Sequence, residues 1–120
     1  MVSGGGADFP KQARLRKRSE FLSLSRRGKK IYAPHFLIII KPNERREARL
    51  GVTASSKVGN AVVRNRVKRF LRECFRRYRH QIVPSSDVLI IARKEASNIS
   101  WHEVEKEIRD ILIENRGRQK

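Results

Sequence analysis

The sequence has few of the features of a secreted or membrane protein. Cys74 is the only cysteine among 120 residues, so no internal disulfide can form and nothing indicates an oxidising compartment. Apolar runs such as residues 36–40 are far too short to cross a bilayer. Residues 1–6 contain no apolar segment of the kind that a signal peptide needs. We therefore expect a cytoplasmic protein with no membrane partner.

Acidic residues are scarce. The chain has 12 Asp and Glu against 29 Lys and Arg, which gives a formal net charge of +17. Residues 103–120 contain as many acids as bases, so the whole excess lies in residues 1–102. A chain of this length is expected to form a single domain. Positive charge confined to one part of it indicates a binding face for a polyanion rather than a means of general solubility.

Residue patterns for conventional catalysis are also missing. His35, His80 and His102 fall in different predicted elements without metal-ligand spacing. We find no carboxylate pair with the spacing of a metal-dependent nuclease, no glycine-rich phosphate loop and no nucleophile elbow. Cys74 occupies an apolar helical position, which is typical of a small buried residue rather than a nucleophile. The residues alone predict a binding protein with no catalytic or metal-ligating side chain of its own.

The most informative stretch that is present runs from Gly59 to Arg79. Between Arg64 and Arg79 it holds eight Lys or Arg and one acid, Glu73. Apolar residues at three- and four-residue steps predict one buried stripe of a helix. The stripe consists of Val63, Val67, Phe70, Leu71, Cys74 and Tyr78. The opposite side, here called the cationic row, consists of Asn65, Lys68, Arg69, Arg72, Arg76 and Arg79, with Arg64 and Arg66 on its flanks.

The cationic row fits a polyanion. Guanidinium groups form bidentate bonds to phosphate and stay charged at physiological pH. The helix N-terminus adds N–H donors and a partial positive charge beside Arg64. Solvated helix faces usually carry both positive and negative side chains, whereas the only acid here is Glu73. We expect Glu73 either to reduce the net positive charge of the row or to pair with an arginine one turn away. We interpret the row as a nucleic-acid contact rather than an ordinary solvated face.

A basic arm precedes the first predicted helix. Residues 9–18 carry Arg14 and Arg16 among scattered apolar side chains. Two interpretations remain open. The arm is either a disordered tail or a segment laid along RNA and pinned by Phe9 and Leu15.

Three helices are predicted. The first covers residues 18–27, with Ser19 as its N-cap and Gly28 as its stop. The second is the basic helix described above. The third begins with a capping box, in which Ser100 is the N-cap and Glu103 the third helical residue.

Three strands are predicted with them. Residues 36–41 and 48–55 are strand-like and are joined by a hairpin-like loop, 42–47. Residues 87–93 form a continuous apolar run, which is typical of a central buried strand. Residues 28–30 are predicted as a loop.

The predicted order is α-β-β-α-β-α. This order favours an α+β fold, a small α/β sandwich with one sheet of about four strands and helices packed on it. We expect residues 1–120 to be a single RNA-binding domain, with residues 1–8 as a flexible tail and residues 116–120 as a frayed one.

Residues 59–73, Gly-Asn-Ala-Val-Val-Arg-Asn-Arg-Val-Lys-Arg-Phe-Leu-Arg-Glu, resemble the signature of the protein subunit of bacterial ribonuclease P. In that family an Arg-Asn-Arg triplet opens a helix after a Gly-x-Ala-Val lead-in and continues into Lys-Arg and Arg-Glu. The likeness extends over roughly residues 9–112. It includes residues 49–52, Arg-Leu-Gly-Val, and residues 90–93, Ile-Ile-Ala-Arg.

The resemblance implies an endoribonuclease that works as a ribonucleoprotein. In that family the RNA subunit carries the active site and its magnesium ions, and the holoenzyme cuts the 5′ leader from precursor tRNA. The protein supports the RNA fold, holds the leader in a cleft between the first helix and the sheet, and needs no protein partner. The family fold also has a left-handed βαβ crossover, whereas general topology rules predict a right-handed one.

The resemblance also implies two sets of site residues. The set expected to contact the catalytic RNA is Arg64, Asn65, Arg66, Lys68, Arg69 and Arg72. The arginines that extend this basic surface are Arg76, Arg14 and Arg16. The set expected to line the leader cleft is Phe21, Leu37, Ile39, Ser55 and Lys57. Such a cleft suits a single strand, which binds by stacking on aromatic side chains and by charge.

Three positions depart from the family pattern. Ser25 stands where a second aromatic residue is common, Ile39 replaces a tyrosine, and Ser56 replaces one of two lysines. Each lost base–aromatic contact weakens binding by roughly 1–3 kcal/mol. Phe21 also has a simpler interpretation, since an aromatic residue in a short helix usually packs in a core.

Two other functions remain open from the residues alone. A ribosomal protein or another structural RNA binder has the same kind of basic surface, and would travel with a ribosomal subunit. A DNA-binding protein would place the basic helix in a major groove, although no dimerisation element or helix-turn-helix is evident.

Overall fold

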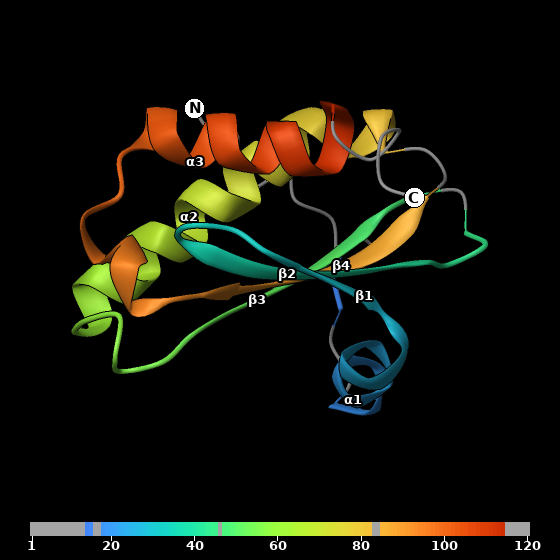
Figure 1. The fold of residues 1–120 in the computed structure, drawn as a ribbon, viewed down its shortest axis with the longest axis horizontal. Helices are drawn as coiled ribbons and strands as arrows, with labels where there is room; N and C mark the ends of the chain where they lie inside the picture. Colours follow the sequence, from blue (N-terminus) through green and yellow to red (C-terminus); the bar gives the residue numbers. More distant parts are fainter. Residues whose placement is uncertain (1–13, 16–17, 46, 83–84, 115–120) are drawn as a thin grey trace.

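The computed structural model describes residues 14–15, 18–45, 47–82 and 85–114. Helices α2 and α3 cover one face of a sheet, and α1 lies against the other face (Figure 1). The elements are, in order, α1 (Arg18–Arg27), β1 (Lys29–Tyr32), β2 (Phe36–Pro42), β3 (Arg49–Ala54), α2 (Ala61–Tyr78), the 3-10 turn η3 (Arg79–Gln81), β4 (Ser86–Ala92), the 3-10 turn η4 (Lys94–Asn98), α3 (Trp101–Arg109) and the π-helical turn η5 (Asp110–Glu114).

The sheet has the strand order β1-β2-β4-β3. The prediction of a central buried strand over 87–93 is confirmed, because β4 lies between β2, to which it is antiparallel, and β3, to which it is parallel. The hairpin-like loop predicted over 42–47 is wrong, since β4 separates the two strands that this loop connects. Helix α2 joins the parallel pair β3 and β4 in a βαβ crossover, and the left-handed sense of this crossover stays a prediction.

Strand β1 occupies a place where the sequence predicts a loop. It pairs antiparallel with β2, with Lys29 opposite Ile40 and Tyr32 opposite Leu37. Three of its four residues are exposed, so it lacks the apolar alternation by which a strand is recognised. The order is therefore α-β-β-β-α-β-α, and the α+β sandwich with a sheet of about four strands is confirmed.

The two faces of the sheet contribute to two hydrophobic clusters. The larger cluster lies beneath α2 and α3 and includes Ile38 and Ile90. The smaller one lies beneath α1 and consists of Leu15, Leu24, Ile39 and Leu89, with Phe21, Leu37 and Ile91 packed against it. Because β2 and β4 are covered on both faces, their sequences are continuous apolar runs.

Helix α1 approaches the sheet closely. It begins at Arg18, so Ser19 lies inside the helix and its prediction as the N-cap is wrong. Gly28 ends the helix as predicted, and its N–H donates to the Leu24 carbonyl at 2.8 Å. A Cβ on Gly28 would lie 2.5 Å from Cγ2 of Ile39, and a Cβ on Gly51 would lie 2.6 Å from Cε1 of Phe21. Glycine at both positions therefore allows α1 to pack against β2 and β3.

The capping box of α3 is present as predicted. The Ser100 hydroxyl accepts a hydrogen bond from the Glu103 N–H at 3.1 Å, and the Glu103 carboxylate accepts one from the Ser100 N–H at 2.9 Å. The bond from the Ser100 N–H favours the charged carboxylate and holds the pKa of Glu103 below its ordinary value. None of the described helices combines the length and apolar character that a membrane crossing requires.

Candidate nucleic-acid interface

The start of α2 is fixed by the Gly-Asn lead-in. Asn60 is the N-cap, and its side-chain oxygen accepts a hydrogen bond from the Val63 N–H at 3.0 Å. Gly59 has a φ of +153°, which favours glycine, and a Cβ there would lie 2.9 Å from the Val63 side chain. These contacts fix the direction in which the chain enters α2, and the cationic row begins one helical turn after Asn60.

Replacing Asn60 by alanine should lower the free energy of unfolding by about 1 kcal/mol, because the helix loses its N-cap. Asn65→Ala in the same helix is the matched control, since Asn65 is exposed. It should change stability by less than about 0.5 kcal/mol. Urea unfolding of both variants measures the difference. Equal effects of the two substitutions on stability would show that the cap does not hold α2.

The apolar stripe of α2 packs into the larger cluster. Val67, Leu71 and Cys74 are fully buried, as predicted, and so is Phe75, which the predicted stripe missed. Burial raises the pKa of the Cys74 thiol to about 12, so this cysteine is a packed side chain and not a nucleophile. The helix is thereby held rigidly against the sheet.

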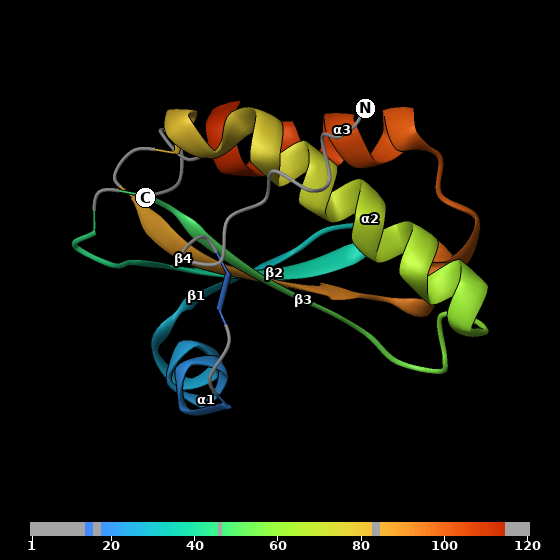
Figure 2. The same ribbon diagram turned by 180° about the vertical axis from the view of Figure 1, so that it is seen from behind.

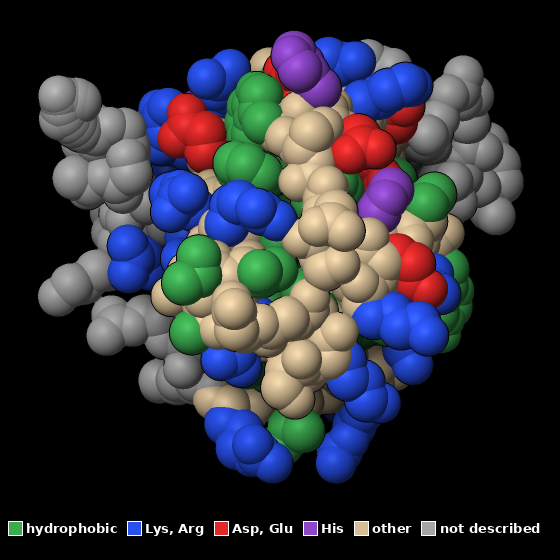
Figure 3. All heavy atoms as spheres, turned by 90° about the vertical axis from the view of Figure 1, so that its left-hand side faces the viewer, with side chains coloured by type: hydrophobic (Ala, Val, Ile, Leu, Met, Phe, Trp, Pro, Cys, Tyr) green, Lys and Arg blue, Asp and Glu red, His purple; other side chains and the backbone are tan. Residues whose placement is uncertain are grey.

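The cationic row lies on the outer side of α2. Asn65, Arg69 and Arg72 are exposed, and Arg64 and Lys68 are half-buried. In Figure 3, Lys and Arg side chains are seen on several sides of the molecule and are most numerous on the left and along the bottom, whereas most of the acidic side chains in this view lie on the right. The charge is therefore directed, as its distribution in the sequence predicts.

Arg79 does not belong to the outward row. Its side chain is 7% exposed and pairs with Glu47. The α-helix ends at Tyr78 and residues 79–81 form a 3-10 turn, so the helical spacing that placed Arg79 outside no longer applies.

Three other arginines of α2 are engaged within the protein. Arg66 donates from Nη2 to the Ser97 carbonyl of η4 at 2.6 Å, so it also holds that turn. Glu73 accepts from Arg76 at 2.6 Å and from Arg77 at 3.1 Å, which confirms that it pairs one turn away. Hydrogen bonds from Arg76, and to a smaller extent from Arg77, hold the pKa of Glu73 below its ordinary value, although partial burial acts to raise it. Arg66 and Arg76 therefore offer less free charge than Arg69 and Arg72.

The basic arm is pinned at one of the two predicted residues. Leu15 is 5% exposed in the smaller cluster, and its N–H donates to the Leu50 carbonyl of β3 at 2.9 Å. Arg14 forms a parallel bridge with Leu50 and is exposed. Figure 2 shows this short blue segment beside β3. Arg16 and Phe9, also predicted on the arm, lie outside the described residues.

The predicted leader-cleft residues divide into three groups. Phe21 and Leu37 are half-buried at the edge of the smaller cluster. Ser55 and Lys57 are exposed in the connection from β3 to α2, where the Lys57 N–H donates to the Ser55 hydroxyl at 3.3 Å. Ile39 is only 2% exposed beneath α1. Its prediction as a cleft-lining residue is therefore corrected, because its side chain packs under the helix and is not accessible to a bound strand.

The exposed aromatic residue Tyr32 was missed by the sequence reasoning. It is 71% exposed and occupies the register position opposite Leu37. It was missed because residues 28–30 were predicted as a loop and residues 31–32 were assigned to no element.

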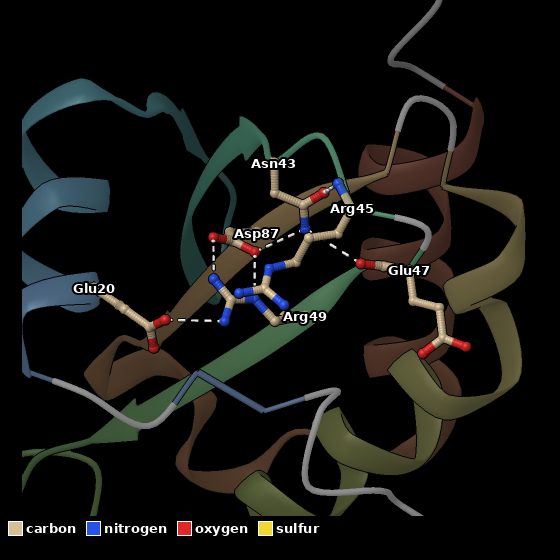
Figure 4. Close-up of polar contacts among 6 residues, drawn as sticks. All are labelled: Glu20, Asn43, Arg45, Glu47, Arg49 and Asp87. Carbon is tan, nitrogen blue, oxygen red and sulfur yellow. Dashed lines mark hydrogen bonds and ion pairs between the residues drawn. The ribbon is translucent and has the colours of Figure 1, made fainter.

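A polar network ties α1 to the sheet (Figure 4). Arg49 of β3 is only 9% exposed. It donates hydrogen bonds to Asp87 from Nε at 2.9 Å and from Nη2 at 2.8 Å. It also donates from Nη1 to Glu20 of α1 at 2.9 Å. Asn43 donates to Asp87 at 2.8 Å. Hydrogen bonding to Asp87 raises the pKa of Arg49 against the effect of burial. Burial opposes ionisation of Asp87, but the bonds from Arg49 and Asn43 prevail and hold its pKa below the ordinary value.

This network predicts a pH dependence of stability. Because the pKa of Asp87 is lower in the folded than in the unfolded chain, its contribution is complete above the ordinary value of 3.8 and is lost as the pH falls through the folded value. Asp87→Asn should therefore be much less stable than wild type at pH 7, and the gap should narrow below about pH 4. Urea unfolding between pH 2 and 7 measures this gap. A gap of constant size would exclude Asp87 as a charged partner.

Among the described residues no group of three or more His, Cys, Asp or Glu side chains is placed to hold a metal ion. What the described surface offers is a set of cations on a rigid helix and an aromatic side chain near a sheet edge. These are the elements of RNA binding by charge and stacking.

A family model agrees with this geometry. The model described as Ribonuclease P matches residues 9–115. The chain belongs to the ribonuclease P protein family. It is a protein component of ribonuclease P and acts in tRNA processing.

Relatives in the ribonuclease P family match over most of their length. The ribonuclease P protein component of Citrifermentans bemidjiense is 42% identical, with 85% of this chain and 87% of that protein covered. The ribonuclease P protein component of Listeria innocua is 40% identical, with the same shares covered.

Solved structures of ribonuclease P proteins share the fold. A mutant of the Staphylococcus aureus protein with defective mRNA degradation activity gives a TM-score of 0.79 at 29% identity, over 85% of this chain and 86% of that one. The Thermotoga maritima protein in complex with 1-(4-fluorophenyl)-2-thiourea gives 0.77 at 32% identity, over 82% of this chain and 96% of that one.

Proposed function

We propose that this chain binds the catalytic RNA of ribonuclease P through α2 and the single-stranded leader of precursor tRNA on the side of α1. The observation that carries the proposal is the cationic row on the outer side of a helix whose inner side is fully packed. In this proposal the active site belongs to the RNA, and no other protein is required. The cytoplasmic location expected from the sequence is part of the proposal.

Two features support a division of the surface between the two RNAs. Arg69 is exposed on α2, which covers one face of the sheet, whereas Phe21 lies on α1, which covers the other face. Rigid cations suit a folded RNA backbone, and an aromatic residue suits an unpaired base. The protein then increases substrate affinity by touching both RNAs.

Magnesium is assigned to the RNA subunit in this proposal. Among the described residues no group of three or more His, Cys, Asp or Glu side chains is placed to hold a metal ion, and Asp87 and Glu73 are engaged by Arg49 and Arg76. No step of the reaction is therefore derived through a protein-bound ion.

Reconstitution tests the proposal. The purified chain alone should leave precursor tRNA intact, and its addition to a bacterial ribonuclease P RNA at low magnesium should restore accurate removal of the leader. A ribosomal protein of similar charge is the control. It shows whether any strongly basic protein restores cleavage simply by reducing the repulsion between RNA phosphates. If the chain changes neither the cleavage by that RNA nor its substrate affinity, the proposal is wrong.

A further inference from the structure

Tyr32 is an aromatic residue that is not part of the larger cluster. It is 71% exposed and lies on β1, the strand at the edge of the sheet away from β3. Among the described Phe, Tyr and Trp residues, only Phe21 also lies outside the larger cluster, which includes Phe36, Phe70, Phe75, Tyr78 and Trp101. Most of the surface of Tyr32 is therefore open to a ligand.

Strand pairing places Tyr32 on the face of the sheet that carries α1. Its neighbours Ile31 and Ala33 face the larger cluster on the other side, and side chains alternate along a strand. Tyr32 pairs with Leu37, which packs against the smaller cluster. Because Cβ atoms of directly opposed residues lie about 4.5–5.5 Å apart, the ring starts beside the Leu37 side chain.

A row of side chains runs across this face from Tyr32 to β3. Leu37 pairs with Ile91, and Ile91 pairs with Thr53. All three of these residues are half-buried. The next row along the strands is closed, since Ile39 is buried beneath α1. The row from Tyr32 to Thr53, here called the open row, therefore borders α1 and is accessible to a bound strand.

Phe21 lies at the β3 end of the same face. A Cβ on Gly51 of β3 would lie 2.6 Å from Cε1 of Phe21, so the ring sits over this strand. The strand order separates β3 from β1 by three strand spacings, which is about 15 Å. A stacked nucleic-acid strand rises about 3.4 Å per nucleotide, so it covers this distance in about four nucleotides, and an extended strand needs fewer. The two rings are therefore spaced for bases a few nucleotides apart in one strand.

A cation accompanies the Tyr32 ring. Lys30 precedes Tyr32 by two residues, so it lies on the same face of β1, and it is exposed. Stacking on an aromatic side chain beside positive charge is the usual way in which a single strand is bound without sequence preference. The edge of the sheet at β1 therefore offers both parts of such a contact.

We propose that Tyr32 is a specificity-determining residue that stacks on a base of the single-stranded leader after the leader has crossed the open row from Phe21. The inference rests on the proposed function, in which the active site belongs to the RNA held by α2. Because α2 packs against β3, the leader reaches Phe21 first and Tyr32 a few nucleotides later. The holoenzyme thereby binds long leaders more tightly than short ones.

Precursor tRNAs with leaders of increasing length test this path in the reconstituted holoenzyme. Tyr32→Leu, which removes the ring but keeps an apolar side chain, should weaken the binding of long-leader substrates about fivefold to thirtyfold. The loss should begin at a leader about two to four nucleotides longer than the one at which Phe21→Leu first weakens binding. Tyr32→Phe keeps the ring and should bind within about twofold of wild type. An equal loss at every length, a loss that begins no later than that of Phe21→Leu, or no loss would overturn the proposal.

Two controls separate stacking from other roles of Tyr32. Leu22→Ala removes another exposed apolar side chain, on α1, and should change substrate affinity at no leader length. Because Tyr32 is exposed, Tyr32→Leu should keep the thermal unfolding midpoint within about 2 °C of wild type, and a larger drop would show a structural role instead. Weaker binding of Tyr32→Leu to the catalytic RNA without substrate would assign the ring to that RNA and contradict the proposal.

Fluorescence of 2-aminopurine at single leader positions reports stacking directly, because its emission falls when it stacks on a ring. The wild-type holoenzyme should quench the probe about two to four nucleotides beyond the position that depends on Phe21, and Tyr32→Leu should restore the emission there. Quenching that survives Tyr32→Leu would refute the stacking. If the wild-type holoenzyme does not process precursor tRNA at all, the proposed function fails, and this inference with it. If processing is normal but Tyr32→Leu changes neither the length dependence nor the quenching, only the inference about Tyr32 fails.

Discussion

Replacement of Arg49 by methionine is expected to lower the free energy of unfolding by about 3 kcal/mol. Removing one partner of a buried ion pair usually costs about 3–5 kcal/mol, because the remaining charges lose part of their compensation. The lower end applies because the side chains of Asp87 and Glu20 keep 19% and 25% of their exposure. Methionine conserves the length of the side chain, so the loss reports the network rather than a cavity. Urea unfolding at pH 7 provides the measurement.

The Arg49 substitution should also affect function through α1. Glu20 precedes Phe21, so loss of the bond from Arg49 frees the helix that presents this ring. Arg45→Met is the matched control, because Arg45 lies nearby on the exposed loop after β2 and should change stability by less than about 0.5 kcal/mol. Equal stability of both variants would show that the network does not anchor α1.

The triple variant Arg64→Gln, Lys68→Gln, Arg69→Gln should bind the catalytic RNA about a hundredfold to a thousandfold more weakly at 0.1 M salt. Each phosphate contact contributes roughly 0.9 to the slope of log affinity against log salt, so the slope should become shallower by about 2–3. These side chains lie outside the buried stripe, so the fold should remain intact. Filter binding across a salt series gives both quantities.

The control for the triple variant is a charge loss elsewhere on the surface. Lys106 on α3 is 74% exposed and pairs only with Asp110 in the described part of the chain. Lys106→Gln with Arg45→Gln should leave the slope within about 1 of wild type. A triple variant with an unchanged slope would place the RNA contact somewhere other than the outer side of α2.

The parts of the fold that could be predicted are those in which local pattern and packing agree. The stripe of α2 repeats at helical spacing, and the capping box at Ser100 is read directly from residues 100–103. The apolar run of β4 is long because both faces of that strand are covered. In each case one short segment contains the whole signal.

The parts that could not be predicted depend on residues far apart in the chain. The network of Glu20, Arg49 and Asp87 joins three elements, and its members look like ordinary surface charges in the sequence. Arg79 was misplaced because the change from α-helix to 3-10 turn rotates it inward. Strand β1 has too few buried residues to be recognised without its partner β2.

Directed cleavage of the RNA is the most direct test of the claim that the outer side of α2 contacts the catalytic RNA. Cys74 is fully buried and its pKa is raised to about 12, so a new surface cysteine can be labelled selectively. An iron chelate that generates hydroxyl radicals is attached at Arg69→Cys or, on the far side, at Lys106→Cys, in the reconstituted holoenzyme. The account predicts localised cuts in the catalytic RNA from position 69 and none from position 106. Cuts from position 106 alone would contradict it.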